Sequence, residues 1–184
     1  MHQTLRLHPD SLCFAATHIE VEVARPRDCS LVLSYVVTGK ISDVRMPPVM
    51  AAARSDELWR HTCFEAFVRA LPGAAYYEFN FAPSTQWAAY RFNSYRSGMR
   101  VAAEIGAPPI EVHSGADRYT LQATLDLDRL SDLPREAVWR LGLSALIEDI
   151  SGRKSFWALA HPPGKPDFHH SDCFAYEFSP AGRP

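Results

Sequence analysis

The chain of 184 residues lacks several patterns that mark whole classes of protein. No stretch approaches about 18 consecutive apolar residues, so no membrane-spanning helix is predicted. The formal net charge is -2 and the arginines are scattered, whereas a dedicated nucleic-acid binder carries a basic stripe. The first residues have no long apolar run behind a positive start, so we expect no secretory signal and a cytoplasmic location. We therefore expect no nucleic-acid partner and no membrane partner.

Short motifs for common chemistries are also missing. The chain has no G-x-G-x-x-G or G-x-x-x-x-G-K-[ST] phosphate loop, no H-E-x-x-H zinc motif and no G-x-S-x-G turn. Its four cysteines are widely spaced and form no C-x-x-C pair, although a disulfide stays open at this point. Cys63 and Cys173 fall in strand-like runs, so we expect them to be buried thiols. We predict no catalytic residue, no metal ligand and no enzymatic activity.

Short strand-like runs dominate what the chain does contain. Residues 18–24 read HIEVEVA, in which isoleucine and valine alternate with glutamate, and a strand sends such residues to opposite faces. Further runs of this kind cover 31–38, 63–69, 76–82, 86–93, 119–126, 139–147, 155–160 and 173–178. Many short strands with turn residues between them predict an all-β fold, an antiparallel sandwich or barrel. The length favours a single domain over 1–184.

Helical signals are few and short. Residues 49–58 are alanine-rich and follow two prolines, which suits either a short helix or a long loop. Residues 127–137 have room for a single helical turn. We expect 40–58 and 160–172 to be the long loops of the domain, and loops of that length are usually functional or mobile.

The stretch 58–96 carries the most information about function. In its run 76–82 every second residue is an aromatic that suits a core, so Glu78 and Asn80 are predicted to point away from that core. Two interpretations stay open for their face. It is either an ordinary solvated sheet surface or a platform for a small polar ligand such as a sugar.

Further polar residues accompany rings on the flanking runs of this stretch. Trp87, Arg91 and Asn93 share one face of the run 86–93, and we count them with the predicted platform. Glu65 is in register with apolar neighbours, where a carboxylate is costly to bury unless it is paired. Arg91 or Arg96 is the expected partner. Glu65 then forms either a structural ion pair inside the sandwich or an acceptor for ligand hydroxyls.

A late loop, residues 160–174, reads AHPPGKPDFHHSDCF and brings three histidines close to Asp172. Such a density of histidine and aspartate suits a metal ion, although the spacing matches no specific zinc pattern. A proline-stiffened loop with capping histidines is the plainer interpretation. In a third interpretation the loop forms a wall of a ligand site, with Phe168, His169 or His170 stacking on the ligand.

Three segments together resemble a known superfamily. RHTCFEAFV, YYEFNFAPSTQWAAYRFNSYR and the closing WALAHPPGKPDFHHSDCF resemble the DOMON-like superfamily, close to the family-nine carbohydrate-binding modules. Within it they are most similar to a bacterial group of stand-alone DOMON-like proteins, and the resemblance covers most of residues 30–178. It implies an immunoglobulin-like antiparallel β-sandwich with few short helices and a ligand pocket. Members of the superfamily bind either haem or sugars.

The sugar-binding branch implies a set of site residues. There, two aromatic rings sandwich a terminal sugar, and a glutamate, an arginine and an asparagine form hydrogen bonds with it. The matching polar positions in this chain are Glu65, Arg91 and Asn93, and Trp59 matches one ring. The second ring belongs to the late loop, where this chain has Phe168 and two histidines in place of an evident tryptophan.

The haem-binding branch, which uses Met and His as axial ligands, is the runner-up. The chain offers Met46, Met50 and Met99 for that role, with the histidines of the late loop, but no cofactor is expected. Our first prediction is a non-catalytic protein that binds a carbohydrate or a similar small polar ligand. The alternatives are a haem- or metal-binding DOMON-type protein and a hydrolase that acts on a sugar derivative through Glu65 and Glu78. The predicted ligand-binding residues are Trp59, Glu65, Glu78, Asn80, Trp87, Arg91, Asn93, Phe168, His169 and His170.

Overall fold

The computed structural model describes residues 1–26 and 29–179, and strands dominate these residues. The strands are β1 (His2–Leu7), β2 (Ala16–Ala24), β3 (Ser30–Gly39), β4 (Cys63–Ala70), β5 (Tyr76–Phe81), β6 (Trp87–Phe92), β7 (Arg100–Val101), β8 (Ile110–Ser114), β9 (Arg118–Asp126), β10 (Trp139–Glu148), β11 (Lys154–Ala158) and β12 (Tyr176–Phe178). Three short 3-10 helices are η1 (Ile41–Asp43), η2 (Leu58–Arg60) and η3 (Ser171–Cys173). Over the described residues, no helix has the length and apolar character that crossing a membrane requires.

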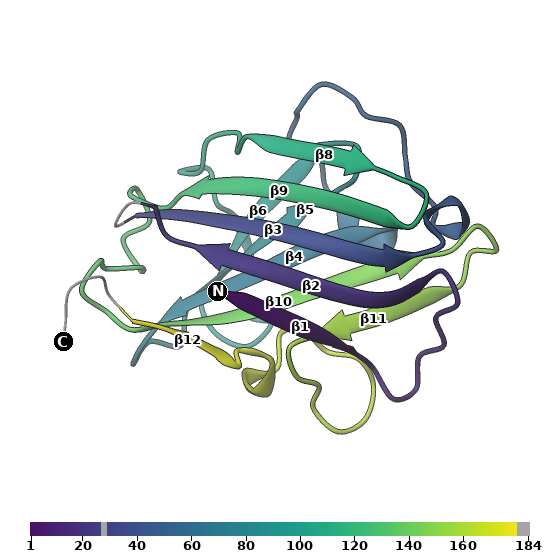
Figure 1. Ribbon diagram of the computed structural model, residues 1–184. Coiled ribbons are helices and arrows are strands. Elements are labelled where there is room, and N and C mark those ends of the chain that lie inside the picture. Colours follow the sequence, from purple (N-terminus) through teal and green to yellow (C-terminus); the bar gives the residue numbers. More distant parts are fainter. Residues whose placement is uncertain (27–28, 180–184) are drawn as a thin grey trace.

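The strands pair antiparallel throughout and form two layers. Figure 1 shows β8, β9, β3, β2 and β1 in front of β6, β5, β4 and β10. The neighbour order runs β7-β6-β5-β4-β10-β11-β1-β2-β3-β9-β8, and β12 pairs with β10. Strand β1 pairs with β2 on one side and with β11 on the other, so it connects the layers along one edge. The predicted all-β antiparallel sandwich is confirmed.

The main core lies between the two layers, and residue alternation explains its composition. In β2, Ile19, Val21 and Val23 are buried, as the HIEVEVA pattern predicts. Across the interface, Tyr35 of β3 packs on Phe64 of β4 with ring centroids 5.1 Å apart. Burying one large apolar side chain stabilises the fold by about 1.5–3 kcal/mol, so these inward faces hold the layers together.

Both faces of the β4–β5–β6 region are covered. A second apolar cluster lies on the side away from the main core and contains Phe67, Tyr76, Ala88, Tyr90, Phe92 and Phe174. Trp59 from η2 and Phe168 from the late loop pack against this cluster. Consequently every residue of β5 is buried, although only every second one faces the main core.

The two segments with helical signals form no α-helix. Residues 49–57 are a loop, which was one of the two interpretations open for this segment, and Leu58 begins η2. The alanines there are exposed, so a helix would have buried no apolar face. The loop is fixed by Arg54, whose guanidinium stacks on Trp87 at 4.1 Å and donates to the carbonyls of Ala89, Ala102 and Ile105. Residues 127–137 form turns. The strands β1, β7 and β8 have no counterpart among the predicted runs.

Candidate functional site

A pocket of about 380 Å³ opens on the face of β4 and β5 that points away from the main core. The late loop, η2 and the turn after β6 complete its walls. Its lining residues are Trp59, Glu65, Glu78, Phe92, Arg96, Met99, Leu146, Phe156, Pro166, Phe168 and His169.

Strand register places both glutamates of the pocket on its floor. Residues directly opposite in an antiparallel pair project to the same face. Glu65 of β4 lies opposite Asn80 of β5 and opposite Ser144 of β10. Asn80 donates its amide Nδ2 to Oε1 of Glu78 at 2.7 Å, and the Ser144 hydroxyl donates to Oε2 of Glu65 at 3.4 Å. The carboxyl groups therefore sit side by side on adjacent strands, each with one neutral donor.

Burial dominates the ionisation of this pair. Glu65 and Glu78 are 4% and 5% exposed. Removal from water raises the pKa of Glu65 well above its usual range, and the nearby charge of Glu78 raises it further. Burial likewise raises the pKa of Glu78 to about 7, against the lowering effects of the Asn80 hydrogen bond and the Arg96 charge. Both carboxyl groups therefore keep their protons to a higher pH than exposed glutamates do.

His169 closes the pocket beside these carboxyl groups as a neutral ring. Its Nδ1 lies 2.8 Å from the Tyr76 hydroxyl, and its Nε2 lies 3.6 Å from Oε2 of Glu78. Burial and the nearby Arg96 guanidinium lower its pKa to about 4. The imidazole is therefore uncharged at neutral pH, and it does not balance the charge of Glu78.

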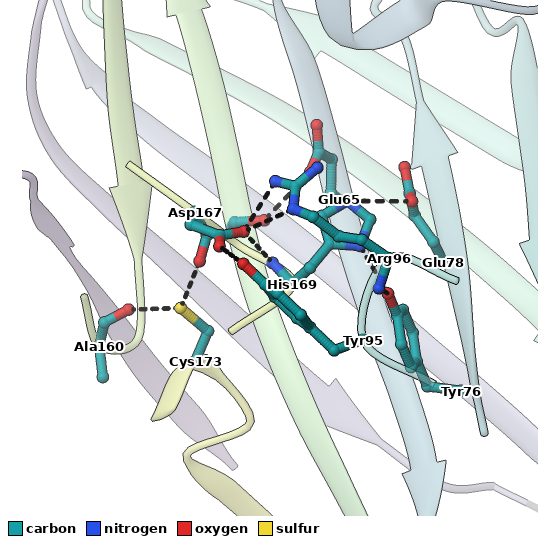
Figure 2. A network of polar contacts seen from close by, with 10 residues as sticks. Glu65, Tyr76, Glu78, Tyr95, Arg96, Ala160, Asp167, His169 and Cys173 are labelled. Atoms are coloured by element: carbon teal, nitrogen blue, oxygen red, sulfur yellow. Dashed lines mark hydrogen bonds and ion pairs between the residues drawn. The ribbon is translucent and has the colours of Figure 1, made fainter. Parts of the chain in front are cut away.

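Asp167 of the late loop fastens the wall to the turn after β6 (Figure 2). Nη2 of Arg96 lies 2.7 Å from one carboxylate oxygen of Asp167, and the Tyr95 hydroxyl donates to the other at 2.5 Å. The Cys173 thiol donates to the Asp167 carbonyl at 3.2 Å from within the loop. These contacts hold Phe168 and His169, the next two residues, over the pocket.

The turn that presents Arg96 has an unusual backbone. Arg96 has a φ of 50°, a left-handed conformation that is uncommon outside glycine. Its own N–H donates to the Tyr76 hydroxyl at 3.2 Å. Gly98 has a φ of 65°, and a Cβ there would collide with the side chain of Asn93. Strained residues persist where surrounding contacts hold them, which is common at functional sites.

Two large rings flank the carboxyl groups. Trp59 packs edge-on against Tyr90 of β6, with centroids 5.7 Å apart. Phe168 packs against Phe156 of β11 at 6.1 Å. Since β5, β4 and β10 lie between β6 and β11, the rings stand on either side of the strands that carry Glu65 and Glu78.

Half of the residues predicted from the sequence line this pocket. They are Trp59, Glu65, Glu78, Phe168 and His169. Asn80 is fully buried next to them and contacts Glu78 rather than the open space.

Two predicted residues, Trp87 and Arg91, lie on the core side of β6, which corrects their assignment to the platform. Trp87 is buried in the main core under Arg54. Arg91 lies opposite Tyr77, so it projects to the core side of the sheet, where its Nε donates to Asp132 at 2.5 Å. It is therefore not the partner of Glu65.

Asn93 and His170 are also outside the pocket. Asn93 is exposed just after β6 and accepts a hydrogen bond from Arg91. His170 precedes η3, where its Nδ1 accepts from the Asp172 N–H at 3.3 Å, so this histidine has the capping role that the sequence left open.

Several pocket residues escaped prediction as site residues. Arg96 was considered only as a partner of Glu65, and Met99 only as a haem ligand. Phe92 could have been found from the sequence, because it lies two residues beyond Tyr90 and therefore on the same face of β6. In the structure that face is the one that Glu78 shares, since Glu78 lies opposite Tyr90 and Tyr76 opposite Phe92. Leu146 and Phe156 lie opposite each other on β10 and β11, and this long-range pairing leaves no local trace.

The histidines of the late loop point to different neighbours, which bears on the metal and haem alternatives. His161 packs against His8 at 4.8 Å and contacts the Arg6 carbonyl at 2.8 Å, away from His169. Residues 1–26 and 29–179 contain no group of three His, Cys, Asp or Glu side chains that could hold a metal ion. Met99 and His169 do share the pocket, but both ring nitrogens of His169 face protein groups, so the site does not fit axial ligation of haem.

Comparison with protein-family models and with curated proteins gives no match. Solved structures do resemble the chain. A candidate carbohydrate-binding protein from Bacteroides uniformis ATCC 8492 aligns with a TM-score of 0.64 at 12% identity, over 94% of this chain and 83% of its own. A family 9 carbohydrate-binding module from Caldicellulosiruptor kristjanssonii, in complex with glucose, aligns with a TM-score of 0.52 at 14% identity, over 98% of this chain and 86% of its own. The chain therefore shares its β-sandwich fold with structures of carbohydrate-binding proteins.

Proposed function

We propose that this chain is a non-catalytic carbohydrate-binding protein of the DOMON-like group, and that it holds a small sugar or polyol in the pocket over β4 and β5. The observation that carries the proposal is one cavity that combines Trp59 and Phe168 with the buried carboxyl groups of Glu65 and Glu78. The fold shared with structures of carbohydrate-binding proteins supports it.

Each part of the pocket suits one property of a sugar. The rings of Trp59 and Phe168 line the pocket and offer apolar area to the C–H groups of a pyranose. Carboxyl groups with raised pKa values offer both protonated donors and ionised acceptors near neutral pH, which matches hydroxyl groups that donate and accept. The volume of about 380 Å³ lies near the lower end of the usual 300–1,000 Å³ for ligand pockets, which favours a mono- or disaccharide.

Sugar hydrolysis is less well supported by the same carboxyl groups. Glycosidases place an acid and a base or nucleophile on either side of the scissile bond. Here Glu65 and Glu78 come from adjacent strands and both lie on the floor of the pocket, rather than on opposite walls. We expect no turnover of chromogenic glycosides by the purified protein.

Isothermal titration against a panel of mono- and disaccharides tests the binding proposal. We expect at least one sugar to bind, and Trp59→Ala to weaken that binding by about tenfold or more, which is 1.4 kcal/mol. Phe14→Ala is the matched control, because Phe14 is an exposed ring that does not line the pocket. Failure of every sugar to bind the parent protein would overturn the proposal.

A further inference from the structure

The pocket floor holds more negative charge than its surroundings balance. Within the described residues, no cationic nitrogen lies within 4.0 Å of the Glu65 carboxylate. Nε2 of His169 lies 3.6 Å from Oε2 of Glu78, but this imidazole is neutral at neutral pH and supplies no positive charge. Most buried carboxylates are paired with a cation, because an isolated buried charge is costly.

The nearest permanent cation is already engaged. Arg96 lines the same pocket, but its guanidinium forms an ion pair with Asp167 at 2.7 Å. One positive charge thus faces three carboxyl groups, those of Glu65, Glu78 and Asp167. Burial raises the pKa values of Glu65 and Glu78, because without a nearby counterion each buried carboxyl group favours its protonated form.

A ligand ammonium group would supply that counterion better than a proton does. An ammonium has three N–H donors, enough to engage both carboxylates at once. Trp59 and Phe168 also line the pocket, and aromatic rings attract a cation that lies over their negatively charged π clouds. A neutral hydroxyl in the same place would leave the surplus charge uncompensated.

We propose that the pocket selects an amino sugar, a carbohydrate with a primary ammonium group that Glu65 and Glu78 bind together. This inference rests on the proposed carbohydrate-binding function and names its ligand class. It also predicts a pH dependence. Binding of the ammonium form strengthens as pH rises from about 5 to about 7, because Glu78, whose pKa burial raises to about 7, increasingly loses its proton as pH approaches that value.

Other titratable groups around the pair do not account for such a change. His169 stays neutral over this interval, since its pKa is about 4. Burial raises the pKa of the phenols and of the thiol still further from neutrality. The charged and titratable groups that face the pair from the surrounding elements are Cys63, Tyr76, Tyr90, Arg96, Asp167 and His169.

Isothermal titration with glucosamine, galactosamine and mannosamine tests the inference. Each amine is compared with its parent hexose and with its N-acetyl derivative, which keeps the nitrogen but not the charge. We expect at least one amine to bind about tenfold more tightly than both neutral partners near pH 7. Glu65→Gln and Glu78→Gln keep the shape of the side chain, and each is expected to reduce that preference to about threefold or less. Glu111→Gln, an exposed change on β8, is the matched control and leaves the preference unchanged.

The outcomes separate this inference from the function on which it rests. Equal binding of amines and parent hexoses would overturn the inference and leave carbohydrate binding intact. A preference for amines that survives both glutamine variants would also overturn it, because the charge would then be read elsewhere. Failure of all the amines, hexoses and N-acetyl sugars, together with the wider panel, would overturn the proposed function itself. The pH series on the parent protein needs no variant, and an amine affinity that falls between about pH 5 and 7 contradicts the inference.

Discussion

The two faces of β5 are equally buried, yet they differ in what they bury. Phe79 and Phe81 on the inner face lie in the main core among other apolar side chains. Glu78 and Asn80 on the outer face are just as inaccessible, but they carry a carboxyl group and an amide beside an open cavity. Burial alone therefore does not distinguish the core from the candidate site in this protein. The distinguishing feature is an ionisable group that is buried without a counterion.

The largest expected effect is a loss of stability from a substitution on the inner face of β5. Phe79→Ala removes a fully buried ring between the layers and should lower the free energy of unfolding by about 3–5 kcal/mol, since it leaves a cavity. Urea denaturation of the parent and the variant measures this loss. Phe14→Ala, which truncates an exposed ring, should change stability by about 0.5 kcal/mol or less. A cost below about 1 kcal/mol for Phe79→Ala would show that the inner face is not tightly packed.

A substitution on the outer face of β5 is expected to have a smaller effect, and to raise stability rather than lower it. The pKa of Glu78 is about 7 in the fold, against 4.5 for an ordinary glutamate. Between these two pH values the native state therefore holds a proton that the unfolded chain has lost. Stability therefore falls as pH rises from about 4.5 to about 7, and then levels off. Glu78→Gln removes this loss and should make the protein more stable than the parent by about 2–3 kcal/mol near pH 8.

Denaturation of both proteins across this pH range checks the effect of Glu78→Gln. Near pH 4 the two proteins should differ little, because the glutamate is then protonated in both states. Glu65 keeps its own contribution in the variant, so the pH dependence weakens without vanishing. Identical pH profiles would contradict the burial of an unpaired carboxyl group at position 78.

The smallest expected effect comes from Arg91→Ala, which tests which face of β6 points to the pocket. Arg91→Ala breaks a partly exposed ion pair with Asp132 and should cost about 1 kcal/mol of stability or less. Sugar affinity should stay within about twofold of the parent, because Arg91 projects away from the pocket. Arg96→Ala, in contrast, removes a pocket residue and should weaken binding. A loss of affinity for Arg91→Ala as large as that for Trp59→Ala would place Arg91 in the site after all.

The sequence pattern predicted most of the strands, but it did not reveal β1, β7 and β8. Alternation located β2, β3, β4, β5, β6, β9, β10 and β11 to within about two residues at each end. Strand β7 has only two residues, and β8 is largely exposed, so neither shows a clear apolar period. Strand β1 owes its place to pairing on both sides with β2 and β11, which no local pattern reveals.

Predicting the site required knowing which face of each strand looks outward. The sequence indicated correctly that Trp87 and Arg91 share a face, but it did not show that this is the core face. Only the register, in which Tyr90 lies opposite Glu78, assigns the faces of β6. Arg96 and Met99 enter the pocket from a turn whose path depends on long-range contacts. Trp59 was predictable from its place at a loop-to-strand junction, and Phe168 from its place in a long loop, because such loops often carry binding residues.

The fastening of the late loop by Asp167 has a consequence for how fast a ligand leaves. The Arg96 side chain in this ion pair is 51% exposed, so dissolved salt reaches and screens it. The sheet that forms the floor depends on backbone hydrogen bonds and apolar packing, which moderate salt leaves unchanged. Rising ionic strength should therefore loosen one wall without deforming the floor. Residence time of a bound sugar would then shorten with salt through the opening of this wall, even for a ligand that carries no charge.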